Sequence, residues 1–276
     1  MNKMISIQLG ARRLILVLRA VVSAFWNYFV NIVLPGHRGK RPRLVEWSAK
    51  VARDFVHAFD IKVTVKGTLP TQGIIASNHL SYLDIPLLAS IAPMNFVSKQ
   101  EVKYWPVFGW FGILAGTLFL RRNSKSHAVE VARQFEDVVG SGVLLTLFPE
   151  GTSTDGSYVK PFHSTLFEPA ARLGWPATPV WIKYSVGRGT VERDICFVGD
   201  MMFLPHFLRL LCLDGIEASV VIGEPMPGNL NRKDLAKGLH RQVCRIAAEN
   251  SGCERRANPQ VEWADHVTDT LLLTSG

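Results

Sequence analysis

The chain has 276 residues, of which 47% are hydrophobic, and its formal net charge is +8. This length suits one large globular domain with an appendage, and the positive charge favours an anionic partner. The 7 Trp and 15 Phe fit a membrane interface better than a nucleic-acid groove, and the sequence contains no nucleic-acid-binding motif, so we expect membrane lipids rather than nucleic acid as partners.

The first predicted element is the apolar segment LILVLRAVVSAFWNYFVNIVL at residues 14–34. It is long enough to cross a bilayer as a helix. However, polar residues recur every four positions and would form a stripe on one helical face, and a lone spanning helix would expose that stripe to lipid. The stripe consists of Arg19, Ser23, Asn27 and Asn31.

We therefore predict that residues 1–43 form a membrane-associated helix or helical hairpin in the interface, followed by a basic hinge at 37–43. A spanning helix and a helix packed only on protein remain alternatives. A signal peptide with a cleavage site at residues 22–24 is a poorer interpretation, because Arg19 interrupts the apolar region before it.

The remaining chain alternates short apolar runs with amphipathic stretches. Helices are predicted at residues 44–59, from Asn123 or Ser124 to Gly140, and at 232–249. Buried short strands between helices indicate an α/β sheet that is at least partly parallel. We assign 44–250 to this domain and 251–276 to a C-terminal tail. Strands are predicted at 61–67, 73–77, 95–98, 116–120, 143–148, 179–185, 195–199 and 218–223.

The 4 cysteines show no C-x-x-C pair and no matching histidine spacing. We therefore expect no metal site, and we expect reduced, mostly buried thiols as in a cytoplasmic domain. These residues are Cys196, Cys212, Cys244 and Cys253.

The sequence NHLSYLD at residues 78–84 places His79 five positions before Asp84, directly after a predicted strand. In one interpretation, Ser81 and Asp84 form a capping box at a helix start. In the other, His79 is a general base whose tautomer and charged form are fixed by Asp84. The two interpretations are compatible, because a capping carboxylate has a second oxygen to offer.

Two further loops follow predicted strands. FPEGTSTDG at 148–156 offers backbone N–H groups and hydroxyls to an anion. GTLFLRR at 116–122 ends in two arginines that can bind phosphate in bidentate fashion, although an exposed pair is commonly only solvated.

Taken together, NHLSYLD, GTLFLRR, FPEGT and TPV (178–180) occur in the order and approximate spacing of the four blocks of the glycerolipid acyltransferases, which the chain resembles over roughly residues 60–200. The closest resemblance is to the 1-acylglycerol-3-phosphate O-acyltransferases (lysophosphatidic acid acyltransferases). The stretch at 96–110 is similar to that family's Lys-containing segment. The resemblance implies a glycerol-3-phosphate acyltransferase-like α/β fold, in which a mixed, partly parallel sheet is flanked by helices.

The resemblance also implies an activity: transfer of an acyl chain from acyl-CoA or acyl carrier protein to the free hydroxyl of a lysophospholipid, without a cofactor or covalent intermediate. His79 and Asp84 would be the catalytic dyad, in a domain on the cytoplasmic face of the inner membrane. The substrate-binding candidates are Asn78, Ser81, Lys99, Gly116, Arg122, Glu150, Gly151 and Thr152.

Glu150 cannot favourably face a phosphate, so we expect it either to brace a cation such as Arg122 or Lys99 or to bind loop amides. Two departures from the family pattern, Ser153 and His163, each remove a cation expected near phosphate. The acceptor is therefore either 1-acylglycerol-3-phosphate or another lysolipid, such as a lyso-ornithine lipid.

Two rival functions remain. A serine hydrolase would require a G-x-S-x-G turn after a strand to carry its nucleophilic serine, and none occurs in the sequence. A non-catalytic lipid-binding protein on the same scaffold would not need His79.

Aromatic residues that could set the acyl-chain length are Trp105, Phe108, Trp110 and Phe111.

Overall fold

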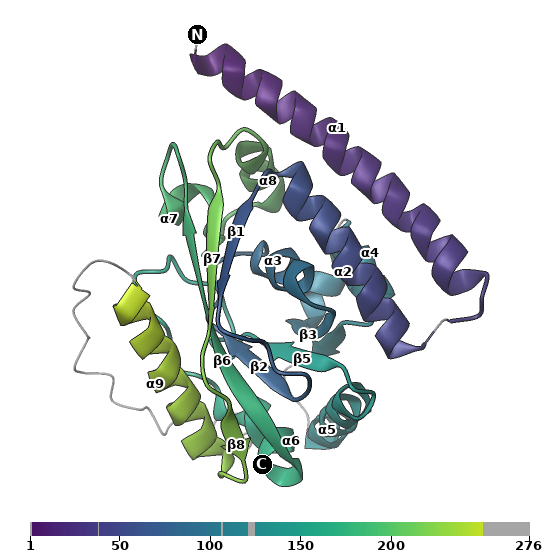
Figure 1. Cartoon of the computed structure of the whole chain (residues 1–276), viewed down its shortest axis with the longest axis vertical. Coiled ribbons are helices and arrows are strands. Elements are labelled where there is room, and N and C mark those ends of the chain that lie inside the picture. Colours follow the sequence, from purple (N-terminus) through teal and green to yellow (C-terminus); the bar gives the residue numbers. More distant parts are fainter. Residues whose placement is uncertain (1, 38, 106, 121–124, 251–276) are drawn as a thin grey trace, which may run out of the picture.

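A computed structural model describes residues 2–37, 39–105, 107–120 and 125–250, with the side chains of residues 2–5 and 125–129 excepted. At its centre is an eight-stranded sheet with the strand order β1-β7-β6-β2-β5-β3-β4, in which β8 also pairs with β6 (Figure 1). The strands are β1 (Lys62–Lys66), β2 (Ile74–Ser77), β3 (Met94–Lys99), β4 (Leu118–Leu120), β5 (Leu144–Leu147), β6 (Gly174–Ser185), β7 (Glu217–Ile222) and β8 (Met226–Gly228).

The pairs β6–β7 and β6–β8 are antiparallel, and the other pairs are parallel. This confirms the predicted mixed, partly parallel sheet. The central strands β2 and β5 are buried along their whole length, which explains why they are short continuous apolar runs rather than alternating ones.

Helices cover both faces of the sheet. Successive β2 residues point to opposite faces, so Ile75 packs into the hydrophobic core on one side, while Ile74 and Ala76 pack into the core on the other. Figure 1 shows α9 on one side of the strands and α2 and α3 on the other. The first core is covered by α2 (Arg41–Ala58), α3 (Asp84–Ile91) and α8 (Phe203–Leu211), and the second by α5 (Lys125–Gly140), α6 (Glu168–Leu173) and α9 (Arg232–Asn250).

Some sequence predictions differ from the structure. The apolar run 195–199 is not a strand but a loop after α7 (Val191–Asp194), and its Ile195 and Cys196 are buried in the core without joining the sheet. Strand β6 begins at Gly174, because residues before 179 pair with β2 and with β8, a strand that the sequence analysis missed. Helix α2 begins at Arg41, inside the predicted hinge.

The N-terminal segment forms one long helix, α1 (Asn2–Tyr28), which continues into a π-helical turn, Phe29–Val33. Helices α1 and α2 form a hairpin (Figure 1). Trp47 Nε1 of α2 donates to the Ala24 carbonyl at 3.0 Å. Over Ser6–Val33 this helix is long and apolar enough to cross a membrane, judged by length and composition alone.

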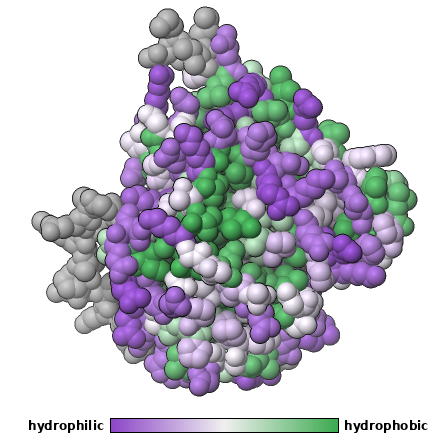
Figure 2. All heavy atoms as spheres, viewed as in Figure 1, coloured by the Kyte–Doolittle hydropathy of each residue, from purple (hydrophilic) through white to green (hydrophobic). Residues whose placement is uncertain are grey.

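Most large apolar side chains of α1 face away from the domain; for example, Val22 is 70% and Trp26 66% exposed. Figure 2 shows hydrophobic side chains at the surface along this helix. By contrast, Asn27 of the polar stripe is half-buried and accepts a hydrogen bond from Lys50 Nζ at 3.1 Å. We call the exposed apolar residues of α1 and of the turn after it the apolar stripe of α1: Ile7, Leu14, Ile15, Leu18, Val22, Phe25, Trp26, Phe29, Val30 and Leu34.

Candidate active site

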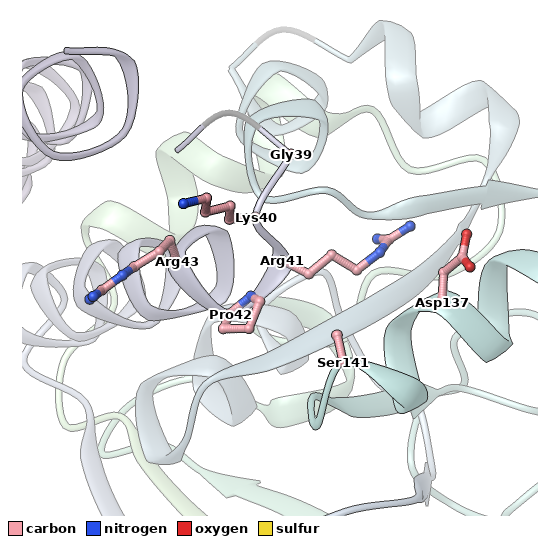
Figure 3. A pocket seen from close by; sticks show the side chains of 7 residues that line it. All are labelled: Gly39, Lys40, Arg41, Pro42, Arg43, Asp137 and Ser141. Atoms are coloured by element: carbon pink, nitrogen blue, oxygen red, sulfur yellow. The ribbon is translucent and has the colours of Figure 1, made fainter. Parts of the chain in front are cut away.

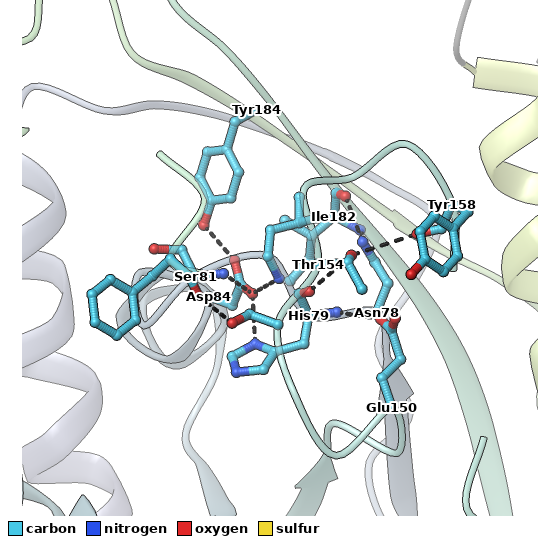
Figure 4. A network of polar contacts seen from close by, with 12 residues as sticks. Asn78, His79, Ser81, Asp84, Glu150, Thr154, Tyr158, Ile182 and Tyr184 are labelled. Carbon is cyan, nitrogen blue, oxygen red and sulfur yellow. Dashed lines mark hydrogen bonds and ion pairs between the residues drawn. The ribbon is translucent and has the colours of Figure 1, made fainter. Parts of the chain in front are cut away.

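The loop between β2 and α3 brings the predicted pair into contact. His79 Nδ1 lies 2.8 Å from Asp84 Oδ2, and Nε2 is on the side of the ring away from the carboxylate (Figure 4). The imidazole stacks on the Phe148 ring with centroids 4.2 Å apart. Its side chain is 20% exposed, while that of Asp84 is fully buried. The pair is therefore open to a substrate on the histidine side only.

The Asp84 carboxylate receives four donors. Oδ2 accepts from His79 Nδ1 and from the backbone N–H groups of Leu80, at 2.7 Å, and Ser81, at 3.0 Å. Oδ1 accepts from the Tyr184 hydroxyl at 2.9 Å. These donors satisfy a carboxylate that water does not reach, and they fix the orientation that the imidazole needs.

The capping interpretation is therefore half right. The Asp84 side chain does reach back to the Ser81 N–H, and α3 begins at Asp84. The Ser81 hydroxyl, however, is fully buried and makes no hydrogen bond with any residue that the structure describes. One carboxylate holds the chain at the start of a helix and the imidazole of His79 at the same time.

Sequence reasoning missed Tyr184. It lies on β6, next to β2 in the sheet, and it is buried. Burial and the nearby charge of Asp84 raise the pKa of Tyr184 well above its usual value, so the hydroxyl remains a proton donor. The only signal in the sequence would have been the pairing of β6 with β2, which cannot be read from one apolar run.

Asn78 has a structural role. It is buried, its side-chain amide donates to the Ile182 carbonyl at 3.0 Å, and its side-chain oxygen accepts from the Ile182 N–H at 2.7 Å. These two bonds continue the β2–β6 ladder past Ser77, the last residue of β2. Asn78 therefore fixes the start of the His79 loop.

Glu150 holds the same loop from the other side. Its carboxylate accepts from the His79 N–H at 2.7 Å and from the Lys160 N–H at 2.8 Å, which is the loop-amide role considered for it from the sequence. Burial raises the pKa of Glu150 to about 7 against the opposing effect of these two bonds. The Thr154 N–H donates to the His79 carbonyl at 2.9 Å, so the loop after β5 binds both peptide groups of His79.

The other candidates are more dispersed. Thr152 is exposed in this loop, and Gly151, with φ of 68°, lies so close to His163 that an added Cβ would be 3.0 Å from the ring. Lys99 is exposed at the end of β3. Gly116 precedes β4, so it lies at the N-terminal ends of the parallel strands, whereas His79 follows the C-terminal end of β2. The Gly116 carbonyl accepts a hydrogen bond from the Asn95 side-chain amide. Arg122 lies outside the described residues.

A cluster of aromatic rings adjoins the His79 loop. Tyr82, from the loop itself, contacts the rings of Phe108, Phe197 and Phe203, and Trp105 contacts the last two. Two of the four aromatic residues considered for chain-length control, Trp105 and Phe108, thus lie beside the loop. The other two do not join this cluster: Trp110 is exposed, and Phe111 packs on Phe25 and Trp47.

A pocket of about 720 Å³ lies between the start of α2 and the end of α5 (Figure 3). Arg41 extends toward Asp137, whereas Lys40 and Arg43 lie on the other side of the backbone, so the three cations do not converge. An added Cβ at Gly116 would be 3.8 Å from Arg41 Nη1. The pocket is therefore at the ends of the strands opposite His79 and is separate from the His79–Asp84 site.

The geometry at His79 suits proton abstraction. An imidazole with Nδ1 bound to a buried carboxylate presents Nε2 to a hydroxyl, and the carboxylate stabilises the imidazolium that forms.

Within the described ranges, no group of three His, Cys, Asp or Glu residues is arranged to hold a metal ion.

Comparisons with known proteins show which proteins the chain is similar to. A family model described as Acyltransferase matches residues 60–183. The chain is 36% identical to the lyso-ornithine lipid O-acyltransferase of Pseudomonas aeruginosa, over 74% of this chain and 78% of that protein. It is 32% identical to the 1-acyl-sn-glycerol-3-phosphate acyltransferase of Neisseria meningitidis, over 54% of this chain and 61% of that protein.

A solved structure has the same fold. The crystal structure of the 1-acyl-sn-glycerophosphate acyltransferase from Thermotoga maritima aligns with a TM-score of 0.68 at 19% sequence identity. The alignment covers 92% of this chain and 99% of that one, so the shared fold extends over nearly the whole chain.

Tyr184→Phe tests the anchoring of Asp84. The variant leaves Oδ1 buried without its donor, so we expect about 1–3 kcal/mol less stability and a fall in turnover with little change in KM. Tyr82→Phe is the matched control, because it removes another buried hydroxyl bond, that to His206 Nδ1 at 2.9 Å. Equal losses of turnover in both variants, measured by kinetics and thermal unfolding, would show that Tyr184 has only a packing role.

Proposed function

This chain belongs to the 1-acylglycerol-3-phosphate acyltransferase family of glycerolipid acyltransferases, and on that premise we propose that its His79–Asp84 pair catalyses acyl transfer from a thioester to the free hydroxyl of a lysolipid. The observation that supports the proposal most directly is the 2.8 Å contact between His79 Nδ1 and a fully buried carboxylate. The exposed edge of the His79 imidazole faces the solvent side of the loop, where an acceptor can enter.

In the proposed reaction, His79 Nε2 takes the proton of the acceptor hydroxyl as the hydroxyl oxygen attacks the thioester carbonyl. The new C–O bond forms, the C–S bond breaks, and the leaving thiolate takes the proton from the imidazolium. Asp84 stabilises the transient positive charge, and Tyr184 and two backbone N–H groups hold Asp84 in place. No acyl-enzyme is needed, so no nucleophilic Ser or Cys is assigned.

The donor is an acyl thioester, either acyl-CoA or acylated acyl carrier protein. It is a co-substrate, and no cofactor is required. For the acceptor, 1-acylglycerol-3-phosphate and lyso-ornithine lipid are both consistent with the family. The greater identity to a lyso-ornithine lipid enzyme supports the second. So does Ser153, which stands where many family members carry an arginine and which donates its hydroxyl to the Phe197 carbonyl.

The acceptor is a membrane lipid, and the exposed apolar stripe of α1 supports acylation at the membrane surface. The stripe faces away from the domain, where it can lie in the acyl-chain region while the domain remains in water. Because the thioester donors are cytoplasmic, we place the domain on the cytoplasmic face of the inner membrane.

Incubation of the purified protein with one labelled acyl thioester and a panel of lysolipids tests the activity and identifies the acceptor. We expect a diacylated product from lyso-ornithine lipid or 1-acylglycerol-3-phosphate, and a loss of about 10²–10⁴-fold in His79→Ala. His57→Ala, on the exposed side of α2, should retain the activity. Undiminished product formation by His79→Ala would rule out this mechanism, and His79-dependent labelling by a fluorophosphonate would indicate a serine hydrolase instead.

Charges on the apolar stripe test the membrane assignment. Val22→Glu combined with Trp26→Glu should move the protein from sedimented vesicles to the supernatant, because both exposed side chains lose their transfer energy to lipid. Leu173→Glu, on an exposed apolar residue of α6, is the control and should stay bound. Retention of the double variant on vesicles would contradict the role of this stripe.

A further inference from the structure

A second exposed apolar surface lies on α8. Leu204 is 62% exposed and Leu208, one helical turn later, is 50% exposed, while Met202, just before the helix, is 72% exposed. The opposite face of α8 is packed into the domain through His206 and Leu210. We call Met202, Leu204 and Leu208 the α8 patch.

The α8 patch is held in a fixed relation to α1. Arg13 of α1 is buried, and its Nη1 donates to the carbonyls of Leu211 and Leu213, at the end of α8. Gly10 approaches the same turn so closely that an added Cβ would lie 2.7 Å from Cys212 Sγ. Figure 1 shows α8 beside the N-terminal half of α1. The two helices are therefore joined by a cation bound to helix-end carbonyls.

The inner face of α8 also reaches the surroundings of the catalytic loop. Phe203 contacts Tyr82 with ring centroids 5.2 Å apart, and His206 Nδ1 lies 2.9 Å from the Tyr82 hydroxyl. Tyr82 belongs to the His79–Asp84 loop. One short helix thus has an exposed apolar face and an inner face that packs against the catalytic loop.

We propose that the α8 patch is a second membrane contact, which dips into the bilayer next to α1 and sets the orientation of the domain. The proposal rests on the membrane-surface acylation proposed above. The helix that carries the patch is joined to α1 by the Arg13 contacts, and the patch consists of apolar side chains only. Three side chains bury far less than the roughly 1,200–2,000 Å² of a stable protein interface, so a second copy of the chain is a poor occupant.

The consequence concerns orientation. A single helix lying in the interface limits the roll of the domain about the helix axis only by the width of its apolar stripe. A second contact on α8, fixed to α1 by Arg13, stops that rotation and holds the loop containing Tyr82 and His79 at a constant angle to the lipid surface. A lysolipid can then present its hydroxyl to His79 without leaving the bilayer.

Site-specific fluorescence quenching tests this proposal in the full chain. Single cysteines at Leu204, Leu208, Val22 and Leu173 are labelled with an environment-sensitive nitrobenzoxadiazole dye, in a background where the exposed Cys212 and the tail Cys253 are serine. The same background without an added cysteine measures how much dye reacts with the two native cysteines that remain, Cys196 and Cys244. Each protein is mixed with phosphatidylethanolamine–phosphatidylglycerol vesicles that carry doxyl-labelled acyl chains.

We expect the dyes at Val22, Leu204 and Leu208 to shift to the blue and to lose most of their emission to the doxyl groups, while the dye at Leu173 stays unquenched. Quenching at Val22 without quenching at Leu204 or Leu208 would overturn the proposal and leave membrane-surface acylation intact. No quenching at any position would remove the membrane premise itself. A blue shift at Leu208 without vesicles that grows with protein concentration would assign the patch to self-association and would also overturn the proposal.

Discussion

The candidate site depends on one carboxylate that is removed from water. An isolated buried charge is costly, and Asp84 is tolerated because four donors surround it: an imidazole, two backbone N–H groups and a tyrosine hydroxyl. The same four contacts fix the tautomer and direction of His79. Burial of the acid and orientation of the imidazole are therefore a single arrangement, and neither can be altered without the other.

The parallel sheet supplies the framework for that arrangement. Strands β2, β5 and β6 are neighbours that run in the same direction, so the loops that follow them meet at one edge. Asn78 ties the loop after β2 to β6, while Glu150 and Thr154 tie it to the loop after β5. Two of the residues predicted from the sequence to bind substrate, Asn78 and Glu150, thus make contacts that hold His79 in place.

Local patterns predicted most of the sheet, because buried parallel strands are short apolar runs, and the His79–Asp84 pair was found because both residues lie in one short loop. Contacts between distant segments were beyond reach. Tyr184, which is 100 residues from Asp84 in the chain, could not be singled out. The run at 195–199 was wrongly predicted as a strand, because a buried loop and a buried strand have the same composition. The position of Gly116 could not be predicted, because the sequence does not reveal whether the strand after it runs parallel to β2.

The central claim is that Asp84 acts through its charge on the tautomer and charged state of His79, and Asp84→Asn tests it most directly. The amide keeps the size of the side chain but disfavours the tautomer with Nδ1 protonated, so turnover with the acceptor found in the lysolipid panel should fall about 10⁴-fold. Thermal unfolding of the variant shows whether the fold persists. A folded Asp84→Asn protein that turns over at a near-normal rate would contradict this account.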